Sequence, residues 1–500
     1  MLQSNRQYFL IIFFLSSLIS FSQGTVGEVK IIDEDQLPKW VKVEKIEIVN
    51  NKITRPWVIL NQFEYQVGDS LQRYDFISKT LQSRKNLVNR QLFTYIDFKV
   101  ETVEEYKVIL TVTVKERWNI WPAPIIQIDA PNINEFFERK DWSRLSYGAS
   151  LGWSNFFGTG HKLKLRMVFG NSNQINASYE IPALSKKVYL GLIPHFEYKG
   201  LRTVNYKSSD DSQELFQLSN QRAYESIKYG IDLKFKHSFY MQHQLKLGYE
   251  AHRIKDTLLA TNPTYLTMDT LSGVRYYTIG YQLEFDKADS KTYPLKGYSV
   301  HVGVDKYGIG LVRKGNIDVF YLNAEIAGYV PIGAGFYWGG KARVRLTPSR
   351  LQPYIFRNGL GYDKVDYLRG YELYSIEGTF YSYFKTNFKF QALNKTWIFV
   401  KKKKPEKEKK KKNDKSTIDV FKNREKKNYF PLGIYINAFA DCGYVQDDFR
   451  SVENFKANEF LLGFGGSIDI VTIYDVIIRL EYVANRDLEH GFRLGFKKAF

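Results

Sequence analysis

The sequence predicts a mostly β protein, in which a transmembrane antiparallel β-barrel follows one small α+β domain. The first reason is a strict alternation of apolar and charged residues, for example in segments 162–169, 338–346 and 492–497. Because side chains alternate between the two faces of a strand, each such segment has one apolar and one charged face. The second reason is the abundance of Tyr and Phe, 36 of each, many of them near segment ends, where membrane barrels carry aromatic girdles.

A soluble sandwich is the alternative fold, because it too would bury one apolar face of each strand. The mean hydropathy of −0.36 does not argue against a barrel, since lumen residues, loops and turns dilute its apolar signal. Beyond the N-terminus no apolar run reaches the length of about 18 residues that a spanning helix needs. The aromatic content favours the barrel.

Residues 1–22 have the pattern of a secretory signal peptide. Arg6 supplies a positive charge, residues 8–19 form a short apolar core, and small residues occupy positions 20 and 22. We expect cleavage before Gln23 and export across the inner membrane. The alternative is a helix that is kept as an anchor.

A linker at 23–40 leads to a predicted small domain at 41–118. A β-like run is followed by a short helix that begins at Thr54-Arg55-Pro56, and then by a longer helix. Two strands follow at about 95–103 and 107–115. The order strand, helix, helix, strand, strand indicates a small soluble α+β domain. The apolar residues at helical spacing in the longer helix are Ile77, Leu81, Val88 and Leu92.

Several local patterns, in this order, resemble those of the BamA/TamA outer-membrane assembly family, also called bacterial surface antigens. The element order of the small domain is similar to that of a POTRA module, the periplasmic domain that precedes the barrel in this family. The POTRA-like patterns are Tyr65-Gln66-Val67-Gly68-Asp69, Asn86-Leu87-Val88-Asn89 with Leu92-Phe93, and Val114-Lys115-Glu116-Arg117. The barrel-like patterns are Asn155-Phe156-Phe157-Gly158-Thr159-Gly160, the turn with Asp286, Asp289, Pro294 and Gly297, Leu368-Arg369-Gly370-Tyr371, and Phe439-Ala440-Asp441-Cys442-Gly443. The resemblance covers nearly the whole mature chain.

The register of this family places sixteen strands in residues 119–500, so that a 16-stranded antiparallel barrel follows a single POTRA module. An even number puts both barrel ends in the periplasm and the long connections at about 200–221, 256–272 and 348–375 outside the cell. The predicted strands are roughly 119–129, 143–156, 162–170, 174–183, 186–199, 222–238, 243–255, 273–286, 297–306, 316–331, 335–347, 376–393, 429–445, 458–472, 475–485 and 491–500.

One periplasmic connection is longer than the others. Between Phe399 and Phe430 there are 14 Lys and Arg and 5 Asp and Glu, a net charge of 14 − 5 = +9 out of the formal +19 of the chain. Such a block cannot collapse on itself, so the Lys-rich loop at 399–428 is predicted to be disordered. It is either a solvated insertion or a docking arm for an acidic periplasmic partner, lipid head groups or a wall polymer. The export signal argues against nucleic acid as a partner.

The sequence has no catalytic constellation. Its seven histidines lie in separate segments without metal-ligand spacing, and neither a G-x-S-x-G elbow nor a P-loop occurs. We therefore expect a protein that is not an enzyme, with no cofactor and no metal.

The resemblance gives the tetrapeptide Leu368-Arg369-Gly370-Tyr371 a place in an outer loop that folds back into the barrel lumen. A guanidinium there stays protonated and needs an acceptor, and the family pattern supplies Asp441 on the barrel wall as its partner. Gly370 would permit close backbone approach, and Tyr371 would pack in the lumen. The alternative is an ordinary loop arginine in a surface salt bridge. Relatives commonly carry a Glu on strand twelve near this arginine, where this chain has Asn387. Asn387 can accept only neutral hydrogen bonds, so Arg369 is expected to depend on Asp441 alone.

The resemblance implies a non-enzymatic factor that assembles, inserts or translocates client proteins or lipid-linked material at the cell outer membrane, with its POTRA domain in the periplasm. Clients would add to an edge strand of the POTRA module, and the barrel would open laterally toward lipid. The implied partners are outer-membrane lipid and unfolded barrel proteins or other exported clients. Two alternatives are an anion-selective pore and a surface receptor or structural barrel. The pore is favoured by basic residues opposite the apolar faces, namely Lys162, Lys164, Arg166, Lys246, Lys341, Arg343, Arg345, Arg479 and Arg493.

A seam between the first and last strands is a further candidate site. Pro122 and Pro124 lie at the start of the first strand, have no N–H, and direct their backbone to the same side. If that side faces the last strand, which ends at Phe500, the barrel would close there with few hydrogen bonds. The alternative is that both prolines precede the paired part of the strand and shape only the linker.

Overall fold

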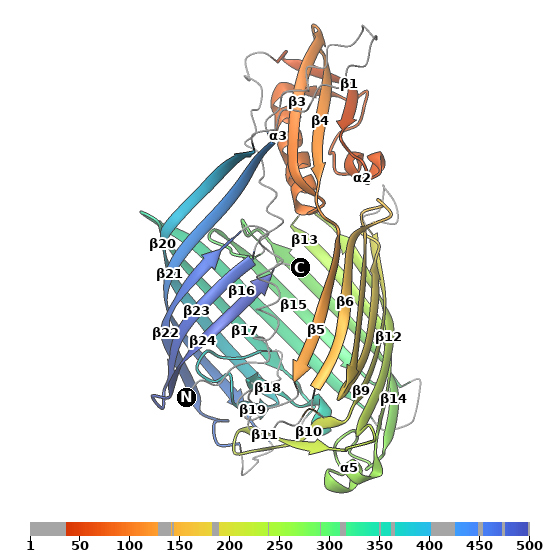
Figure 1. Ribbon diagram of the computed structural model, residues 1–500, viewed down its shortest axis with the longest axis vertical. Coiled ribbons are helices and arrows are strands. Elements are labelled where there is room, and N and C mark those ends of the chain that lie inside the picture. Colours follow the sequence, from red (N-terminus) through yellow and green to blue (C-terminus); the bar gives the residue numbers. More distant parts are fainter. Residues whose placement is uncertain are drawn as a thin grey trace.

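The computed structural model describes residues 37–128, 142, 145–182, 190–238, 240–290, 292–310, 317–349, 352–361, 366–401, 426–448, 454–472 and 476–498. These residues form a small four-stranded sheet with two helices and a large 16-stranded antiparallel sheet (Figure 1). The predicted signal peptide, the Lys-rich segment 402–425 and Phe500 lie outside the described residues.

The small sheet has the strand order β2–β1–β4–β3. Its central strand β4 alternates strictly, and every second side chain is buried against the helices: Val108, Leu110, Val112 and Val114. A proline begins α2, where the missing N–H is not needed. The elements in chain order are β1 (Trp40–Val49), α2 (Pro56–Leu60), β2 (Ser70–Gln72), α3 (Arg73–Asn89), β3 (Phe93–Glu104) and β4 (Lys107–Glu116).

The strands of the large sheet pair in chain order, and β5 and β24 are at the two ends of that order. They are β5 (Ile120–Ile128), β6 (Leu145–Phe156), β7 (His161–Gly170), β8 (Ser172–Glu180), β9 (Leu190–Leu201), β12 (Tyr224–Lys236), β13 (Met241–Ile254), β14 (Gly273–Asp286), β15 (Gly297–Tyr307), β16 (Val319–Gly333), β17 (Phe336–Leu346), β20 (Phe380–Lys401), β21 (Lys426–Gln446), β22 (Phe460–Val471), β23 (Val476–Asn485) and β24 (His490–Lys498).

These strands agree with the predicted spans to within about four residues at each end, except where β20 ends and β21 begins. Their ladder continues to the pair Lys401 and Lys426, whereas the prediction ended the strands at 393 and 429. Beyond the pair Gly433 and Val471, where β22 ends, the two strands form a ribbon of their own. Pairing can continue there because backbone groups of one strand meet those of the other whatever the side chains are.

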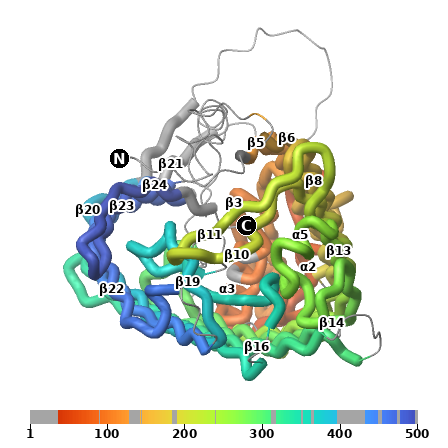
Figure 2. The backbone as a smooth tube through the Cα atoms, turned by 90° about the horizontal axis from the view of Figure 1, so that it is seen from below, coloured from red at the N-terminus to blue at the C-terminus, as the bar shows by residue number. Residues whose placement is uncertain are grey.

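The predicted long outer connections contain short elements that cover one end of the sheet. The sheet curls into a ring-like shape when viewed along its axis, and these elements lie across its opening at the end away from the small domain (Figure 2). A buried apolar cluster that includes Val204, Leu258 and Phe356 holds several of them together. The elements are β10 (Thr203–Ser209), β11 (Ser212–Gln217), α5 (Asp256–Thr261), η3 (Tyr354–Phe356), β18 (Asn358–Gly361) and β19 (Ser375–Gly378).

One face of the large sheet exposes large apolar side chains along its whole width. Register places these residues on the same face from strand to strand, as with Ile436 opposite Ile468 and Ile468 opposite Leu480. Within the described ranges, no helix has the length and apolar character needed to cross a membrane. Exposed members of this face include Phe169, Ile227, Ile279, Val302, Trp338, Phe388, Ile436, Ile468 and Leu480.

Candidate functional site

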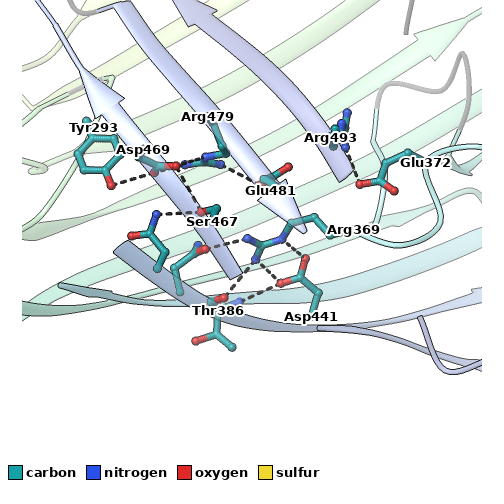
Figure 3. Close-up of polar contacts among 12 residues, drawn as sticks. Tyr293, Arg369, Glu372, Thr386, Asp441, Ser467, Asp469, Arg479, Glu481 and Arg493 are labelled. Atoms are coloured by element: carbon teal, nitrogen blue, oxygen red, sulfur yellow. Dashed lines mark hydrogen bonds and ion pairs between the residues drawn. The ribbon is translucent and has the colours of Figure 1, made fainter. Parts of the chain in front are cut away.

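Part of the connection between β17 and β20 folds back along the inner face of the large sheet, opposite the exposed apolar face. We call residues 366–378 the inner loop. Its side chains approach those of the last strands (Figure 3). A buried apolar cluster fixes it there, made of Leu360, Leu368, Tyr371, Ile376, Tyr381, Tyr383, Val445, Ala457 and Leu461.

Arg369 is 5% exposed and lies at the centre of the polar contacts of the inner loop. Its Nε donates to Oδ2 of Asp441 at 2.6 Å, and its Nη2 donates to Oδ1 of the same carboxylate. Its Nη1 donates to Asn387 Oδ1 at 2.8 Å, and Nη2 also donates to the Thr386 carbonyl at 3.1 Å. The structure thus brings Arg369 and Asp441 together as a bidentate pair. Two neutral oxygens of β20, at Asn387 and Thr386, accept the remaining protons of Arg369, as the presence of Asn387 in place of a Glu implies.

The pattern 439–443 on β21 follows from a strand period of two, which turns residues 439, 441 and 443 to the inner face. The guanidinium carbon of Arg369 lies 3.7 Å from the centroid of the Phe439 ring, a cation–π distance. Asp441 is 1% exposed and pairs with that guanidinium. At Gly443 an added Cβ would lie 3.3 Å from Cδ2 of Leu368. Each of the three positions therefore accommodates one part of the inner loop.

The tetrapeptide is enclosed by strands on both sides. Gly370 has φ +91°, which a side chain disfavours, and its Cβ would lie 3.1 Å from Cβ of Asn485. A Cβ at Gly463 would lie 1.8 Å from the carbonyl oxygen of Arg369. Tyr371 is 2% exposed, and its hydroxyl accepts a hydrogen bond from the Leu462 N–H at 3.4 Å. The loop therefore fits its place on β22 and β23 closely.

The inner loop also reaches the last strand, a contact that no sequence pattern predicts. Glu372 Oε1 accepts from Nη1 of Arg493 on β24 at 2.5 Å, and its Oε2 accepts from the Gly370 N–H at 2.9 Å. Asn485 donates to the Gly370 carbonyl at 3.3 Å. The parity of Arg493 in its strand predicts a place on the basic inner face, but no sequence signal names Glu372 as its partner.

On its other side the inner loop is held by Asp366, which is 7% exposed. The hydroxyls of Tyr381 and Tyr383 on β20 donate to its two carboxylate oxygens at 2.5 and 3.2 Å. Arg343 on β17 lies 3.2 Å from the same carboxylate. The contacts of the inner loop therefore run from β17 across β20 to β24.

A second segment, turn 287–296 between β14 and β15, enters the sheet from the end nearest the small domain. The Tyr293 hydroxyl donates to Oδ2 of Asp469 on β22 at 2.9 Å, and Asp469 is fully buried (Figure 3). Arg479 on β23 binds the same carboxylate through Nε and Nη2, both at 2.7 Å. The Tyr293 ring packs 4.7 Å from that of Tyr435 on β21. This turn, like the inner loop, is anchored to the C-terminal strands.

The acidic and proline pattern of this turn closes it locally. Asp289 Oδ1 accepts from the Leu295 and Lys296 N–H groups at 3.0 and 3.2 Å. Gly297 has φ +104°, and its Cβ would lie 2.2 Å from the Lys287 carbonyl oxygen. Asp289 and Gly297 belong to the pattern that the sequence shows, whereas no sequence signal marks Tyr293, whose contact partners lie far along the chain.

Most of the basic residues predicted on the inner face have acidic neighbours. Six of the nine form ion pairs, and Arg345 lies with its guanidinium carbon 4.4 Å from the Tyr321 ring centroid. The inner face is therefore less positive than the sequence alone indicates. The pairs are Lys162–Glu180 at 3.7 Å, Lys246–Asp305 at 3.8 Å, Lys341–Glu325 at 2.8 Å, Arg343–Glu325 at 3.2 Å, Arg479–Asp469 at 2.7 Å and Arg493–Glu372 at 2.5 Å.

Both candidate seam prolines lie within β5, opposite Leu151 and Ala149 of β6. The alternative in which they precede the paired strand is therefore wrong. The Ser154 N–H donates to the Asn119 carbonyl at 2.8 Å, so odd-numbered residues of β5 direct their backbone groups toward β6. Pro122 and Pro124 consequently face away from β6, toward the open side of the sheet. No ladder joins β5 to β24 in the part of the chain that the structure describes.

The turn at 155–160 between β6 and β7, which carries one of the family patterns, contacts the small domain. Asn155 Nδ2 donates to Thr54 Oγ1 at 2.9 Å, and its Oδ1 accepts from the Gly160 N–H at 2.8 Å. The Arg55 N–H donates to the Gly158 carbonyl at 2.9 Å. Glu116 at the end of β4 supports this contact, because it accepts from the Ile53 and Thr54 N–H groups at 2.8 and 2.5 Å.

Gly160 also lies against α2 and the end of α3. A Cβ at Gly160 would lie 2.9 Å from Nη2 of Arg90 and 3.0 Å from Val58. Burial lowers the pKa of the Arg90 guanidinium, which the Glu180 carboxylate counteracts. The small domain and the large sheet are therefore in direct contact at this turn.

Among the described residues, no group of three or more His, Cys, Asp or Glu side chains is arranged to bind a metal ion. The arrangement instead consists of paired charges that fix two inward segments to strands. Its chemistry is that of structural positioning.

Comparisons with solved structures find similar folds in BamA and CdiB. BamA from Haemophilus ducreyi lacking POTRA domains 1–3 matches with TM-score 0.50 and 14% identity, over 91% of this chain and 83% of its own. CdiB from Escherichia coli matches with TM-score 0.52 and 11% identity, over 91% and 75%. CdiB from Acinetobacter baumannii gives TM-score 0.51 and 11% identity, over 92% and 73%. At these identities the likeness concerns the fold.

The comparison with curated proteins gives no match. The model of the Omp85 superfamily domain matches residues 155–470, which include the turn at 155–160, the inner loop and Asp441. The family predicted from the sequence patterns is thereby confirmed. Since the match spans more than half of the chain, this protein belongs to the Omp85 superfamily.

Proposed function

We propose that this protein is a non-enzymatic factor of the outer membrane that assembles, inserts or translocates unfolded barrel proteins or other exported clients. In this proposal the large sheet closes into a transmembrane barrel, and the small domain is a POTRA module in the periplasm. Superfamily membership supports the proposal, as does the likeness of the fold to BamA and CdiB.

The exposed apolar face supports insertion into a membrane. It runs across the width of the large sheet, and aromatic residues such as Tyr147, Trp338 and Phe492 belong to it. A soluble protein rarely exposes so continuous an apolar surface, because each exposed square ångström costs about 25 cal/mol relative to burial. A surrounding lipid phase removes that cost.

The inner face argues against an anion-selective pore as the main function. Most of its cations have acidic partners, and the inner loop and turn 287–296 enter the sheet from opposite ends. The outer elements also pack across one opening. A passive pore would need none of these anchored segments.

The single observation that carries the proposal is the difference between the two end strands. The inner loop anchors β24 through Arg493, whereas β5 directs two residues without N–H groups toward its open side. Each missing backbone hydrogen bond forgoes about 1 kcal/mol. A junction between β5 and β24 would therefore be the weakest in the sheet, and we propose it as the lateral opening for clients.

The small sheet offers an edge for extended clients. β3 is an edge strand of 12 residues, whereas β2 at the other edge has three. An edge strand can pair with an added chain through its backbone groups. We propose β3 as the first docking strand for clients.

The Lys-rich segment stays a prediction, since it lies outside the described residues. The ribbon of β20 and β21 ends at Lys401 and Lys426 on the side of the small domain (Figure 1). A periplasmic acidic partner there would fit its charge, and the binding would weaken with salt because exposed charges are screened beyond about 10 Å at 0.1 M.

Depletion of the protein in its own cells tests the general function. We expect a broad loss of barrel proteins from the surface proteome. A change in solute uptake with an unchanged surface proteome would support the pore instead and would reject assembly.

A disulfide lock tests the lateral opening. In a Cys442→Ser background, Ile126→Cys on β5 and Phe492→Cys on β24 would tie the end strands. The register pair Val302→Cys and Ala324→Cys would tie β15 to β16 as a control. We expect client assembly to stop with the seam lock and to continue with the control. Full activity of the locked seam would show that clients do not pass between these strands.

A further inference from the structure

The junction between the small domain and the large sheet carries an exposed apolar surface that the proposed assembly function does not use. We call Ile53, Trp57, Leu60 and Phe157 the junction patch. Their exposed fractions are 55%, 37%, 37% and 66%. Trp57 and Leu60 are three positions apart in α2 and share one helix face, while Val58 and Ile59 are buried.

The four residues belong to one surface because loop 53–55 contacts the β6–β7 turn. A Cβ at Gly158 would lie 2.0 Å from the Ile53 carbonyl oxygen, and the Arg55 N–H binds the Gly158 carbonyl at 2.9 Å. Phe157 directly precedes Gly158. α2 lies on the side of the small domain that is nearest the strands β5 and β6 (Figure 1).

The junction patch continues the exposed apolar face of the sheet. The Phe157 ring packs 4.5 Å from Phe156 and 5.5 Å from Trp153, and Phe156 packs 5.6 Å from Tyr179. Register puts Trp153 and Tyr179 opposite Leu163, on the same face as Met167. Aromatic residues at the end of such a face mark the level of lipid head groups.

Two further observations fit a lipid surface. Phe157 adopts φ +49°, an uncommon conformation for a residue with a side chain, and still leaves its ring largely exposed. Lys52 and Arg55, on the same loop, are exposed. Apolar side chains flanked by cations are the usual composition of a segment that lies in a membrane interface.

We propose that the junction patch rests in the head-group layer of the periplasmic phospholipid leaflet and holds the small domain at a fixed tilt beside the β5 edge. This inference rests on the proposed insertion of the sheet into a membrane. Its occupant is phospholipid, because the patch is continuous with the face that the proposal assigns to lipid.

Spin labels on the full chain test the inference. The Cys442→Ser protein would be placed in nanodiscs of phosphatidylethanolamine and phosphatidylglycerol with a label at Ile53→Cys. The matched control is a label at Val103→Cys. Val103 is 58% exposed, but it lies at the end of β3 that is remote from the large sheet. We expect the ratio of oxygen to nickel-complex accessibility to be several-fold higher at Ile53→Cys. Equal, water-like ratios at the two positions would overturn the proposal. It would also be overturned if the label at Ile53→Cys were protected from the nickel complex only after another protein is added.

A third label separates this proposal from the one on which it rests. Phe464→Cys lies on the exposed apolar face of β22 and is 40% exposed. A lipid-like ratio there with a water-like ratio at Ile53→Cys overturns the junction patch alone. Water-like ratios at both overturn membrane insertion as well. The double variant Trp57→Ser and Leu60→Ser should lower the ratio at Ile53→Cys, whereas Trp40→Ser, at the remote end of β1, should leave it unchanged.

Discussion

The last five strands of the large sheet, β20–β24, hold both segments that enter it, whereas the first strands, β5–β7, contact the small domain. On the C-terminal side, Arg369, Glu372 and Tyr293 reach strands far from their own positions in the chain. On the N-terminal side, Asn155 and the turn that follows it bind the loop before α2. One sheet thus has one end fixed from inside and the other attached to a neighbouring domain.

This difference indicates which part moves if the ends of the sheet separate. Inward segments that cross-link β20–β24 make those strands one rigid unit, because several buried contacts would have to break together. β5 depends on its ladder with β6 and on the small domain. We therefore expect opening to displace β5 together with the small domain, while the C-terminal wall keeps its shape.

The largest effect should come from removing the central cation of the inner loop. Arg369→Ala leaves the buried Asp441 carboxylate without its charged partner, which costs about 3–5 kcal/mol in a dry site. We expect the heat-modifiable folded form to be lost at a lower denaturant concentration than in the unmodified protein. The inner loop should also become sensitive to protease.

The matched control is Arg486→Ala, whose side chain is 56% exposed at the outer end of the same wall. It should change the stability little. A double-mutant cycle with Asp441→Asn measures the coupling of the pair. Additive effects of Arg369→Ala and Asp441→Asn would mean that the pair does not fix the C-terminal wall.

A smaller effect is expected at turn 287–296. Tyr293→Phe removes only the hydroxyl and its one hydrogen bond, and the aromatic ring remains packed. Tyr293→Phe removes a donor to the buried Asp469 carboxylate, and a hydrogen bond to a charged group contributes about 1.5–3 kcal/mol. Hydrogen exchange should become faster in β21–β23 near the small domain. Tyr298→Phe, at a 45% exposed position of β15, is the control. Unchanged exchange in Tyr293→Phe would show that the turn does not stiffen the wall.

The contact between the small domain and the β6–β7 turn can be tested in the same way, and there the N-terminal strands should respond. Asn155→Ala leaves the Gly160 N–H and the Thr54 hydroxyl without this amide, which costs about 1–2 kcal/mol. Exchange should increase in β5–β7 and in loop 53–55, with β20–β24 unaffected. Asn173→Ala removes a similar bond, to the Gly170 N–H at 3.1 Å, at the other end of the sheet. Equal responses of the two variants in loop 53–55 would contradict a docking role for Asn155.

The smallest effect on stability is expected for the ion pair between Glu372 of the inner loop and Arg493 of β24. Glu372→Gln weakens a pair whose side chains are 15% and 23% exposed, so solvent screening limits the loss to about 1 kcal/mol. Exchange in β24 should rise, and the seam should open more readily than in Glu459→Gln, whose carboxylate is 62% exposed. If β24 exchanges as slowly as in the unmodified protein, Glu372 does not restrain it.

Much of the architecture could be read from local pattern. Strand period and apolar alternation predicted strands with an apolar and a charged face, because each strand records its two faces in its own residues, and the family resemblance set their number at sixteen. The same parity put Arg479 and Arg493 on the inner face. The ribbon of β20 and β21 was underestimated, because backbone pairing continued where side-chain alternation gave no sign of it.

The contacts of the candidate site could likewise be predicted only in part from the sequence. The resemblance named Arg369 and Asp441, and the structure brings them together. Glu372 and Tyr293 were missed, since an acid or a tyrosine in a loop carries no mark of a partner more than a hundred residues away.

By itself the sequence determined where most strands lie, the two faces of each strand and the residues able to carry charge inward, because these depend on neighbours along the chain. Only the tertiary structure decided which charges meet, that two loops from opposite ends bind the same strands, and that Pro122 and Pro124 face the open side. Those outcomes depend on how sixteen strands curl and on which distant groups then lie within hydrogen-bond distance. No local period encodes that geometry.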